Sequence, residues 1–130
     1  MADLNAFMAA HEEQAWAWGT VDCSMVLADW AIDNGHPDPA AALRGTYSDE
    51  LGWKLIVVAR GGLLPLVSDL CARAGFTATD TAARGVIGVV GSVRHPDRQW
   101  GAIHDGERWL VRAADGFGPI TAPTLGMWVI

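Results

Sequence analysis

Several features are scarce in the 130-residue chain, and each scarcity excludes a class of protein. The nine lysine and arginine residues are scattered without a basic run, and fifteen acidic residues bring the net charge to −6. This balance argues against nucleic acid as the main partner and provides no polybasic patch for a membrane surface. No apolar stretch is long enough for a membrane span, and residues 1–5 lack the basic segment of a signal peptide. We therefore expect a chain made and folded in a cytoplasm, without a membrane span.

Cysteine is also scarce, which bears on disulfides and metals. Only Cys23 and Cys71 are present, and a chain without an export signal more often keeps its thiols reduced. Cys71 falls in an apolar helical pattern and is most simply a core residue. No histidine and cysteine cluster has zinc spacing, and no Asp/Asn/Gly loop has calcium spacing. The sequence predicts no cofactor and no metal site.

Apolar residues, in contrast, are plentiful. They make up 51% of the chain and include seven tryptophans, enough for residues 1–130 to form one domain with a substantial core. Periodicity and capping residues predict helices over 3–15, 22–34, 40–43, 49–60 and 63–74. β-branched runs and turn residues predict strands over 86–90, 99–104, 107–112, 117–121 and 127–130. The predicted class is α+β, with N-terminal helices packed on a C-terminal antiparallel sheet.

Two helices carry more specific expectations. In the helix over 49–60, with Ser48 as a possible N-cap, the spacing of the apolar residues predicts an inward face made by four of them: Leu51, Leu55, Val58 and Ala59. In the first helix, His11 lies at the edge of the apolar face and is expected at the surface.

The stretch from Trp16 to Ser24 carries the strongest chemical signal. Asp22 is a good N-cap residue, which would place Cys23 in the first turn of a helix. Unpaired backbone N–H groups and the helix dipole there favour the nucleophilic thiolate. In the alternative, Cys23 is a small buried apolar residue and Asp22 acts only as a cap instead of shaping a site. Trp16 and Trp18 could line a substrate groove or serve as core or interface anchors.

The same stretch resembles a known motif. Trp18-Gly19-x-x-Asp22-Cys23-Ser24 is similar to the nucleophile motif of the NlpC-type, papain-like cell-wall cysteine peptidases. The whole chain resembles a family of small phage-tail proteins of unsettled function that are related to those peptidases. The matching pieces are Trp16 to Cys23, Asp38-Pro39-Ala40, Arg44-Gly45-x-Tyr47, Gly61-Gly62, Gly85 to Val90, Trp100 to Ile103 and Trp128 to Ile130.

The resemblance implies a catalytic arrangement that this chain departs from. It puts Cys23 at the nucleophile position and a histidine base at the start of a strand, two residues before a glycine. Two alignments are open, and they place either Gln99 or Trp100 at the base position; neither side chain can act as a base. His104 on the same strand and His95 in the preceding loop are the remaining candidates, and the alternative for both is a surface histidine. Arg44 and Tyr47 could bond backbone or clasp the Cys23 helix.

The resemblance also implies a function and partners. It points to a phage or phage-derived tail-tip component that is located in the virion tail after synthesis in the host cytoplasm. Its partners would be other tail-tip proteins such as hub and fibre components. Because the expected histidine is missing, the preferred interpretation is a papain-like domain with a degenerate site, in which Trp16, Trp18, Asp22, Gln99 and Trp100 would border a substrate or partner groove. The alternative is an active murein endopeptidase that uses Cys23 to open peptidoglycan during DNA delivery, so whether the protein is an enzyme stays open.

Overall fold

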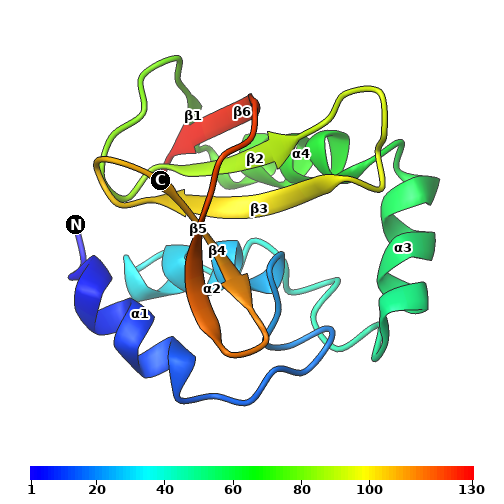
Figure 1. The fold of residues 1–130 in the computed structure, drawn as a ribbon, viewed down its shortest axis with the longest axis horizontal. Coiled ribbons are helices and arrows are strands. Elements are labelled where there is room, and N and C mark those ends of the chain that lie inside the picture. The colour runs from blue at the N-terminus through cyan, green and yellow to red at the C-terminus, as the bar shows by residue number, and fades with distance from the viewer.

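Helices occupy the first part of the chain and strands the second, as the sequence patterns predict (Figure 1). The structure is a computed structural model that describes residues 1–130. The four helices are α1 (Leu4–Glu12), α2 (Met25–Asp33), α3 (Glu50–Ala59) and α4 (Leu63–Ala74). The six strands are β1 (Thr77–Ala78), β2 (Ile87–Gly91), β3 (Gln99–His104), β4 (Trp109–Ala113), β5 (Gly116–Ile120) and β6 (Thr124–Val129). The predicted α+β class with an antiparallel sheet is confirmed.

The sheet curls because of the way its last strands connect. The strand order is β1-β6-β2-β3-β4-β5, so β5 and β6 follow each other in the chain although three strands separate them in the sheet. The short connection over residues 121–123 crosses in front of β3 and β2 (Figure 1). Its Pro123 carbonyl accepts a hydrogen bond of 2.9 Å from the Gly91 amide at the end of β2. Part of the sheet face that lies away from the helices is covered by this connection.

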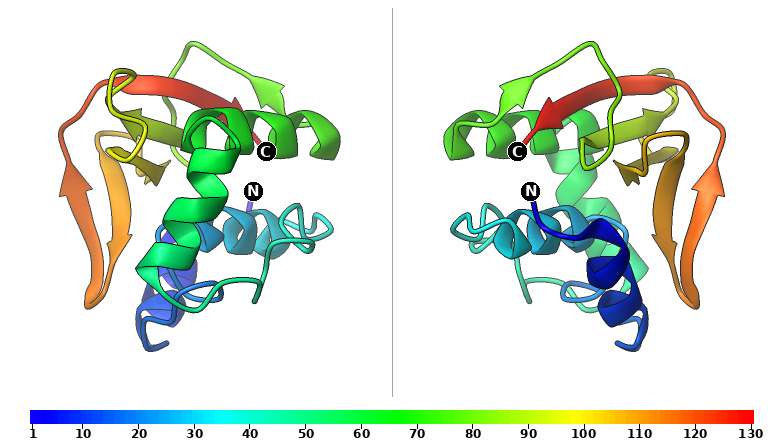
Figure 2. Two further views of the ribbon diagram at one scale, coloured as in Figure 1. Left: turned by 90° about the vertical axis from the view of Figure 1, so that its right-hand side faces the viewer. Right: turned by 90° about the vertical axis from the view of Figure 1, so that its left-hand side faces the viewer.

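The two faces of the sheet therefore carry separate apolar clusters. On the helix side, Ile103 packs in the main core with Trp30 of α2 and Leu63 of α4. The indole N–H of Trp30 donates to the Gly85 carbonyl at 2.9 Å, which fixes α2 against the start of β2. On the other side, a smaller cluster forms under the β5–β6 connection and consists of Val86, Val90, Ala102 and Trp109. Figure 2 shows this curvature, with β4 and β5 turned steeply away from β6.

The predicted inward face of α3 is wrong. Leu51, Leu55 and Val58 are 65%, 64% and 63% exposed, and the buried residues are Trp53 and Val57. Apolar residues surround most of this helix, so their spacing could not identify the packed face. Long-range contacts determine which side of α3 packs against the protein, among them a 3.0 Å hydrogen bond from the Trp53 indole to Ser24 Oγ. The helix is capped by Asp49, which accepts from the Gly52 amide at 2.7 Å, and not by Ser48.

His11 is buried, contrary to the surface position expected from the sequence. It is 2% exposed; its Nε2 lies 2.9 Å from Asp29 Oδ2, and its Nδ1 accepts from Arg112 Nε at 3.0 Å. This contact joins α1, α2 and β4. The Arg112 guanidinium also donates to the carbonyls of His11 and Gln14, and satisfying those carbonyls ends α1 at Glu12 instead of near residue 15.

Other boundaries shift for local reasons. Asp38 accepts from the Ala40 amide at 2.9 Å as a cap would, but only turns follow over residues 40–43. The Asp105-Gly106 hairpin turn is confirmed, and β4 begins two residues later than predicted because Asp105 Oδ1 holds the amides of Glu107 and Arg108 within the turn.

No single helix is long and apolar enough to cross a membrane, and α3 and α4 pass that test only as a pair bent by 73°.

Candidate functional site: the Cys23 turn

Cys23 lies in the turn that leads into α2, directly against β3. The helix begins at Met25, so Cys23 precedes the first turn instead of belonging to it. A Cβ added to Gly101 of β3 would lie 2.6 Å from the Cys23 carbonyl oxygen and 3.0 Å from Leu27 Cδ1. Only a glycine at this strand position lets the sheet approach the turn so closely. The predicted packing of the Cys23 segment on the C-terminal sheet is confirmed.

Asp22 holds the turn in shape through four hydrogen bonds. Its Oδ1 accepts from the amides of Ser24 and Met25 at 2.9 and 2.8 Å. Its Oδ2 accepts from the Gly19 amide at 2.8 Å and from the Tyr47 hydroxyl at 2.6 Å. The N-cap of α2 is Ser24, two residues beyond the predicted position, but Asp22 still accepts from the first helical amide, that of Met25. The Asp22 side chain is completely buried.

Tyr47 and Arg44 clasp this region from the outside, as one of the sequence alternatives holds. Burial first, and then the hydrogen bond to Asp22, hold the pKa of the Tyr47 phenol above its usual value. Arg44 pairs with Asp38 and with Asp29 of α2, each at 2.8 Å. The hydrogen bond to Arg44 is the largest cause that lowers the pKa of Asp38. Both clasping residues therefore act on the segment that carries Cys23.

The surroundings of the Cys23 thiol disfavour its ionisation, contrary to the expectation of a thiolate. The residue is 7% exposed, and burial, followed by the neighbouring Asp22 carboxylate, raises the pKa of the thiol to about 12. The sequence argument relied on the positive end of α2, but the helix begins beyond Cys23 and desolvation outweighs its dipole. The other thiol, Cys71, is also buried, and burial raises its pKa to about 12.

Gln99 is the base-position residue that lies on the Cys23 side of the sheet. Side chains alternate along a strand, and Gly101, two residues away, faces the Cys23 turn. Gln99 is buried, and both ends of its amide are occupied: Oε1 accepts from the Leu64 amide at 3.0 Å, and Nε2 donates to the Ser92 carbonyl at 3.0 Å. Its side chain ties β3 to the start of α4.

Trp100 and His104 lie on the opposite face of β3. Trp100 packs against the smaller apolar cluster. The His104 ring meets the Trp109 ring edge-on with 4.8 Å between centroids, and its Nδ1 accepts from the Gly106 amide at 3.0 Å. The structure does not bring His104 to Cys23.

His95 is exposed in the β2–β3 loop, and no hydrogen bond connects its ring to the Cys23 turn. The histidine that the structure does bring into a buried polar cluster is His11. Sequence reasoning missed it because its partner Arg112 is 101 positions away, and no local pattern signals such a pair.

Trp16 and Trp18 form an aromatic chain that leads to α3. Their rings lie edge to face with centroids 5.2 Å apart, and the Trp18 and Trp53 rings follow at 6.1 Å. Trp18 packs against the main core. Neither residue lines a hollow in the structure, so the geometry agrees with anchoring residues and gives no groove at this position.

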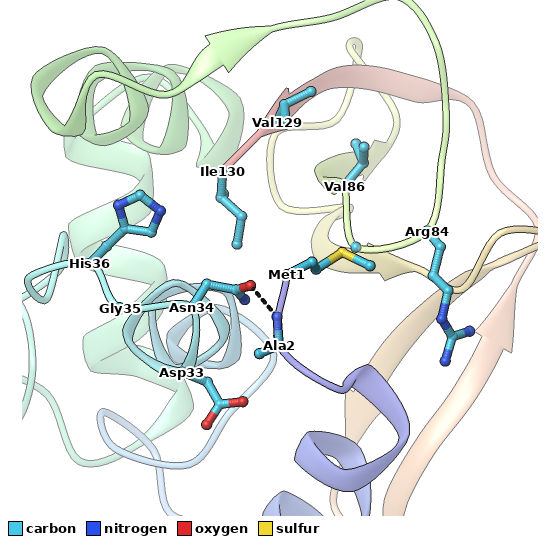
Figure 3. Close-up of a pocket in the computed structure, with 11 residues that line it drawn as sticks. Met1, Ala2, Asp33, Asn34, Gly35, His36, Arg84, Val86, Val129 and Ile130 are labelled. Carbon is cyan, nitrogen blue, oxygen red and sulfur yellow. Dashed lines mark hydrogen bonds between the residues drawn. The ribbon is translucent and has the colours of Figure 1, made fainter.

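Cys23 lines none of the hollows of the molecule, although two small cavities of about 40 Å³ each adjoin its neighbour Ser24. The largest, about 570 Å³, is bordered by Met1, Asn34, His36, Arg84 and Ile130 among others (Figure 3). In it the Ala2 amide donates to Asn34 Oδ1 at 2.8 Å. A second hollow of about 500 Å³ lies beside His11, and a third of about 450 Å³ lies at Trp100. No group of three or more histidine, cysteine or acidic side chains is placed to hold a metal ion.

Comparison with known proteins gives a family. A family model described as a domain of unknown function, DUF6950, matches residues 1–127, so the chain belongs to that family. No curated protein and no solved structure matches the chain.

Proposed function

We propose that this member of the DUF6950 family is a phage or phage-derived tail-tip component with an NlpC-type, papain-like fold and a degenerate catalytic site. The tail assignment and the NlpC-type fold rest on the sequence resemblance. The loss of catalysis rests on one observation, the burial of the Cys23 thiol with a pKa raised to about 12.

That thiol has little nucleophilic character. Burial first, and then the Asp22 carboxylate, raise the pKa of the thiol and disfavour the thiolate at neutral pH. A cysteine peptidase also needs an imidazole within about 3 Å of the sulfur to take up and deliver a proton. Gln99, on the Cys23 side of β3, has an amide that cannot transfer protons and is already bound at both ends. These features support a non-catalytic role.

An exposed apolar stripe on α3 supports an assembly role. We call Leu51, Leu55 and Val58 the α3 stripe; their spacings of four and three place them on one side of the helix. Each is more than three-fifths exposed. The helix lies at the edge of the molecule in Figure 1, with one side against the protein and one facing solvent. Contiguous exposed apolar side chains of this kind mark contact surfaces for other proteins.

The catalytic half of the proposal is tested by digestion of purified sacculi. Wild type and the variants Cys23→Ala, His95→Ala and His104→Ala are compared for release of muropeptides. We expect wild type to release no more than Cys23→Ala. Robust release that disappears in Cys23→Ala would establish the endopeptidase alternative, and its loss in one histidine variant would identify the base.

The assembly half is tested by incorporation into tail particles. We expect the protein to co-purify with tails, and Leu51→Glu with Leu55→Glu to abolish incorporation without unfolding the chain. The matched control is Ser68→Glu with Ala72→Glu, two exposed positions on α4, which should incorporate normally. A soluble monomer that never co-purifies with tails would refute the proposal.

A further inference from the structure

The β2–β3 loop, residues 92–98, is held in one shape by its own hydrogen bonds. The Ser92 amide donates to the Arg98 carbonyl at 2.9 Å, and the Arg98 amide donates to the His95 carbonyl at 2.8 Å. Gly91 precedes the loop with φ +134°, and a Cβ there would collide with the Arg98 carbonyl. The loop lies at the surface, but the hydrogen bond between Ser92 and Arg98 joins its two ends and fixes its backbone.

Two arginines of this loop have no partner in the chain. The five ion pairs use His11, Arg44 twice, Lys54 and Arg73. The other arginines with side-chain hydrogen bonds are Arg84 and Arg112. Arg94 and Arg98 are therefore uncommitted cations on a protein whose net charge is −6, and uncommitted guanidinium groups are suited to carboxylates.

The same two arginines border the hollow of about 450 Å³ at Trp100. Its walls come from the loop, from the β5–β6 connection and from the adjoining ends of β2, β3 and β6, and they include Val93, Ala122 and Pro123. Trp100 is half-buried, and its indole N–H donates to no group of the chain. Asp97 is on the same loop but does not line the hollow. An apolar surface with a free indole and two cations is thus open to solvent.

We propose that this hollow binds an acidic peptide segment of a partner protein, with a carboxylate on Arg94 and Arg98 and an apolar side chain against Trp100. The charge complementarity decides the class of ligand. Only Arg94 and Arg98 line this hollow, and two cations on an acidic protein are too few to hold a nucleic acid, whose binding scales with the number of phosphates neutralised. A carboxylate flanked by apolar residues satisfies both guanidinium groups and the apolar wall.

The hollow also lies at the end of the molecule where the α3 stripe is found. A Cβ on Gly62, at the junction of α3 and α4, would lie 3.3 Å from Pro96 Cβ in the loop, and Figure 1 shows α3 and this loop at the same end. The α3 stripe and the hollow are therefore on neighbouring elements of the fold. The inference goes beyond the proposed function, because it names a surface and the chemistry of its ligand and holds whether or not the partner is a tail protein.

The test uses the purified full chain with isotope-labelled side chains. A short peptide of alternating glutamate and leucine is titrated while the Trp100 indole and the arginine Nε–H signals are followed by NMR. We expect the Trp100, Arg94 and Arg98 signals to shift together and the affinity to fall with added salt. The Arg94→Gln/Arg98→Gln variant should bind about tenfold more weakly, because two charge-assisted hydrogen bonds are lost.

The controls separate this site from general charge attraction. Arg73→Gln/Arg108→Gln removes the same charge from two other exposed positions and should leave the affinity unchanged. An equal loss in both double variants, no shift of Trp100, or equal binding of a peptide with lysine in place of glutamate would each overturn the proposal. Co-sedimentation with phosphatidylglycerol vesicles that depends on Arg94 and Arg98, without peptide binding, would assign the surface to a membrane and overturn it as well. A chain that binds the peptide but never joins tails would refute only the tail assignment.

Discussion

The two faces of β3 differ in what their side chains are free to do. On the helix side, Gln99 is bound at both ends of its amide and Gly101 is pressed against the Cys23 turn. On the other side, Trp100 borders an open hollow, and the His104 ring meets the Trp109 ring edge-on. The helix side is a closed, fully bonded interface, and the other side retains groups that can meet a ligand.

This difference explains why β3, although rich in candidate residues, does not bring a histidine to Cys23. Side chains alternate between faces with a period of two, so a thiol on one side and an imidazole at an even position of β3 are separated by the sheet itself. A shift of the β3 register by one residue would move the His104 side chain to the helix side of the sheet, where Cys23 lies. It would also move Ile103 out of the core and force a side chain into the space that Gly101 leaves.

The largest loss of stability on the helix side of the sheet is expected from substitution of Asp22. Asp22→Ala leaves three backbone N–H groups and the Tyr47 hydroxyl without their acceptor. Each buried orphan costs about 1–3 kcal/mol, so we expect the free energy of unfolding to fall by at least about 3 kcal/mol in urea denaturation. Tyr47→Phe, which removes one of the four bonds, should cost less than half as much. A loss for Asp22→Ala no greater than that for Tyr47→Phe would show that the carboxylate does not organise the turn.

The next largest effect is expected at Gly101. Gly101→Ala puts a Cβ 2.6 Å from the Cys23 carbonyl oxygen, and overpacking of this kind costs about 1–3 kcal/mol. The matched control is Gly118→Ala in β5, where an added Cβ meets nothing within 4 Å. Urea denaturation should show a destabilised Gly101 variant and a control at least as stable as wild type. Equal stabilities would mean that β3 does not press on the Cys23 turn.

The sequence predicted the elements where local signals agree. The bounds of β3 and α4 are those expected, because β3 ends at the Asp105-Gly106 turn and the amphipathic pattern of α4 ends at Gly75, whose φ is +78°. The Asp105-Gly106 turn followed from a side-chain to backbone bond within three residues, and Asp22 forms a similar bond to the Met25 amide although the N-cap of α2 is Ser24. β1, a strand of two residues paired only with β6, has no pattern to detect.

The sequence-based predictions were wrong where contacts between residues far apart in the chain determine which side chains are buried. The packed side of α3 is selected by Trp53 reaching Ser24, 29 positions away, and His11 is buried by Arg112. Of the two interpretations of Cys23, the small buried residue agrees with the structure, and the thiolate fails for a related reason. The sequence showed the helix start that would favour a thiolate, but burial depends on how the sheet closes over the turn, and burial dominates the pKa.

The burial of Cys23 should also appear in the pH dependence of stability, with a smaller effect. The folded pKa of about 12 lies above the ordinary value of 9.0, so between these values the native state binds more protons than the unfolded state. Stability therefore falls as pH rises through this window, by about 1 kcal/mol per buried thiol between about pH 9 and pH 10. In urea denaturation, Cys23→Ala should decline less steeply than wild type, although Cys71 and Tyr47 still contribute. Parallel declines would show that the thiol is solvated in the native state.

For the last variant, His104→Gln, we expect no effect on the reactivity of Cys23. This variant tests whether the sheet separates the imidazole on one face of β3 from the thiol on the other. Cys23 and Cys71 are both buried with pKa values raised to about 12, so each is alkylated by iodoacetamide only when the chain opens. The ratio of the two rates, measured by peptide mass spectrometry, is therefore insensitive to global stability and sensitive to any group that activates one thiol. Because His104 lies across the sheet from Cys23, His104→Gln should leave this ratio unchanged. A fall in the relative rate of Cys23 would mean that the imidazole reaches the thiol, and it would favour the peptidase alternative over the degenerate site.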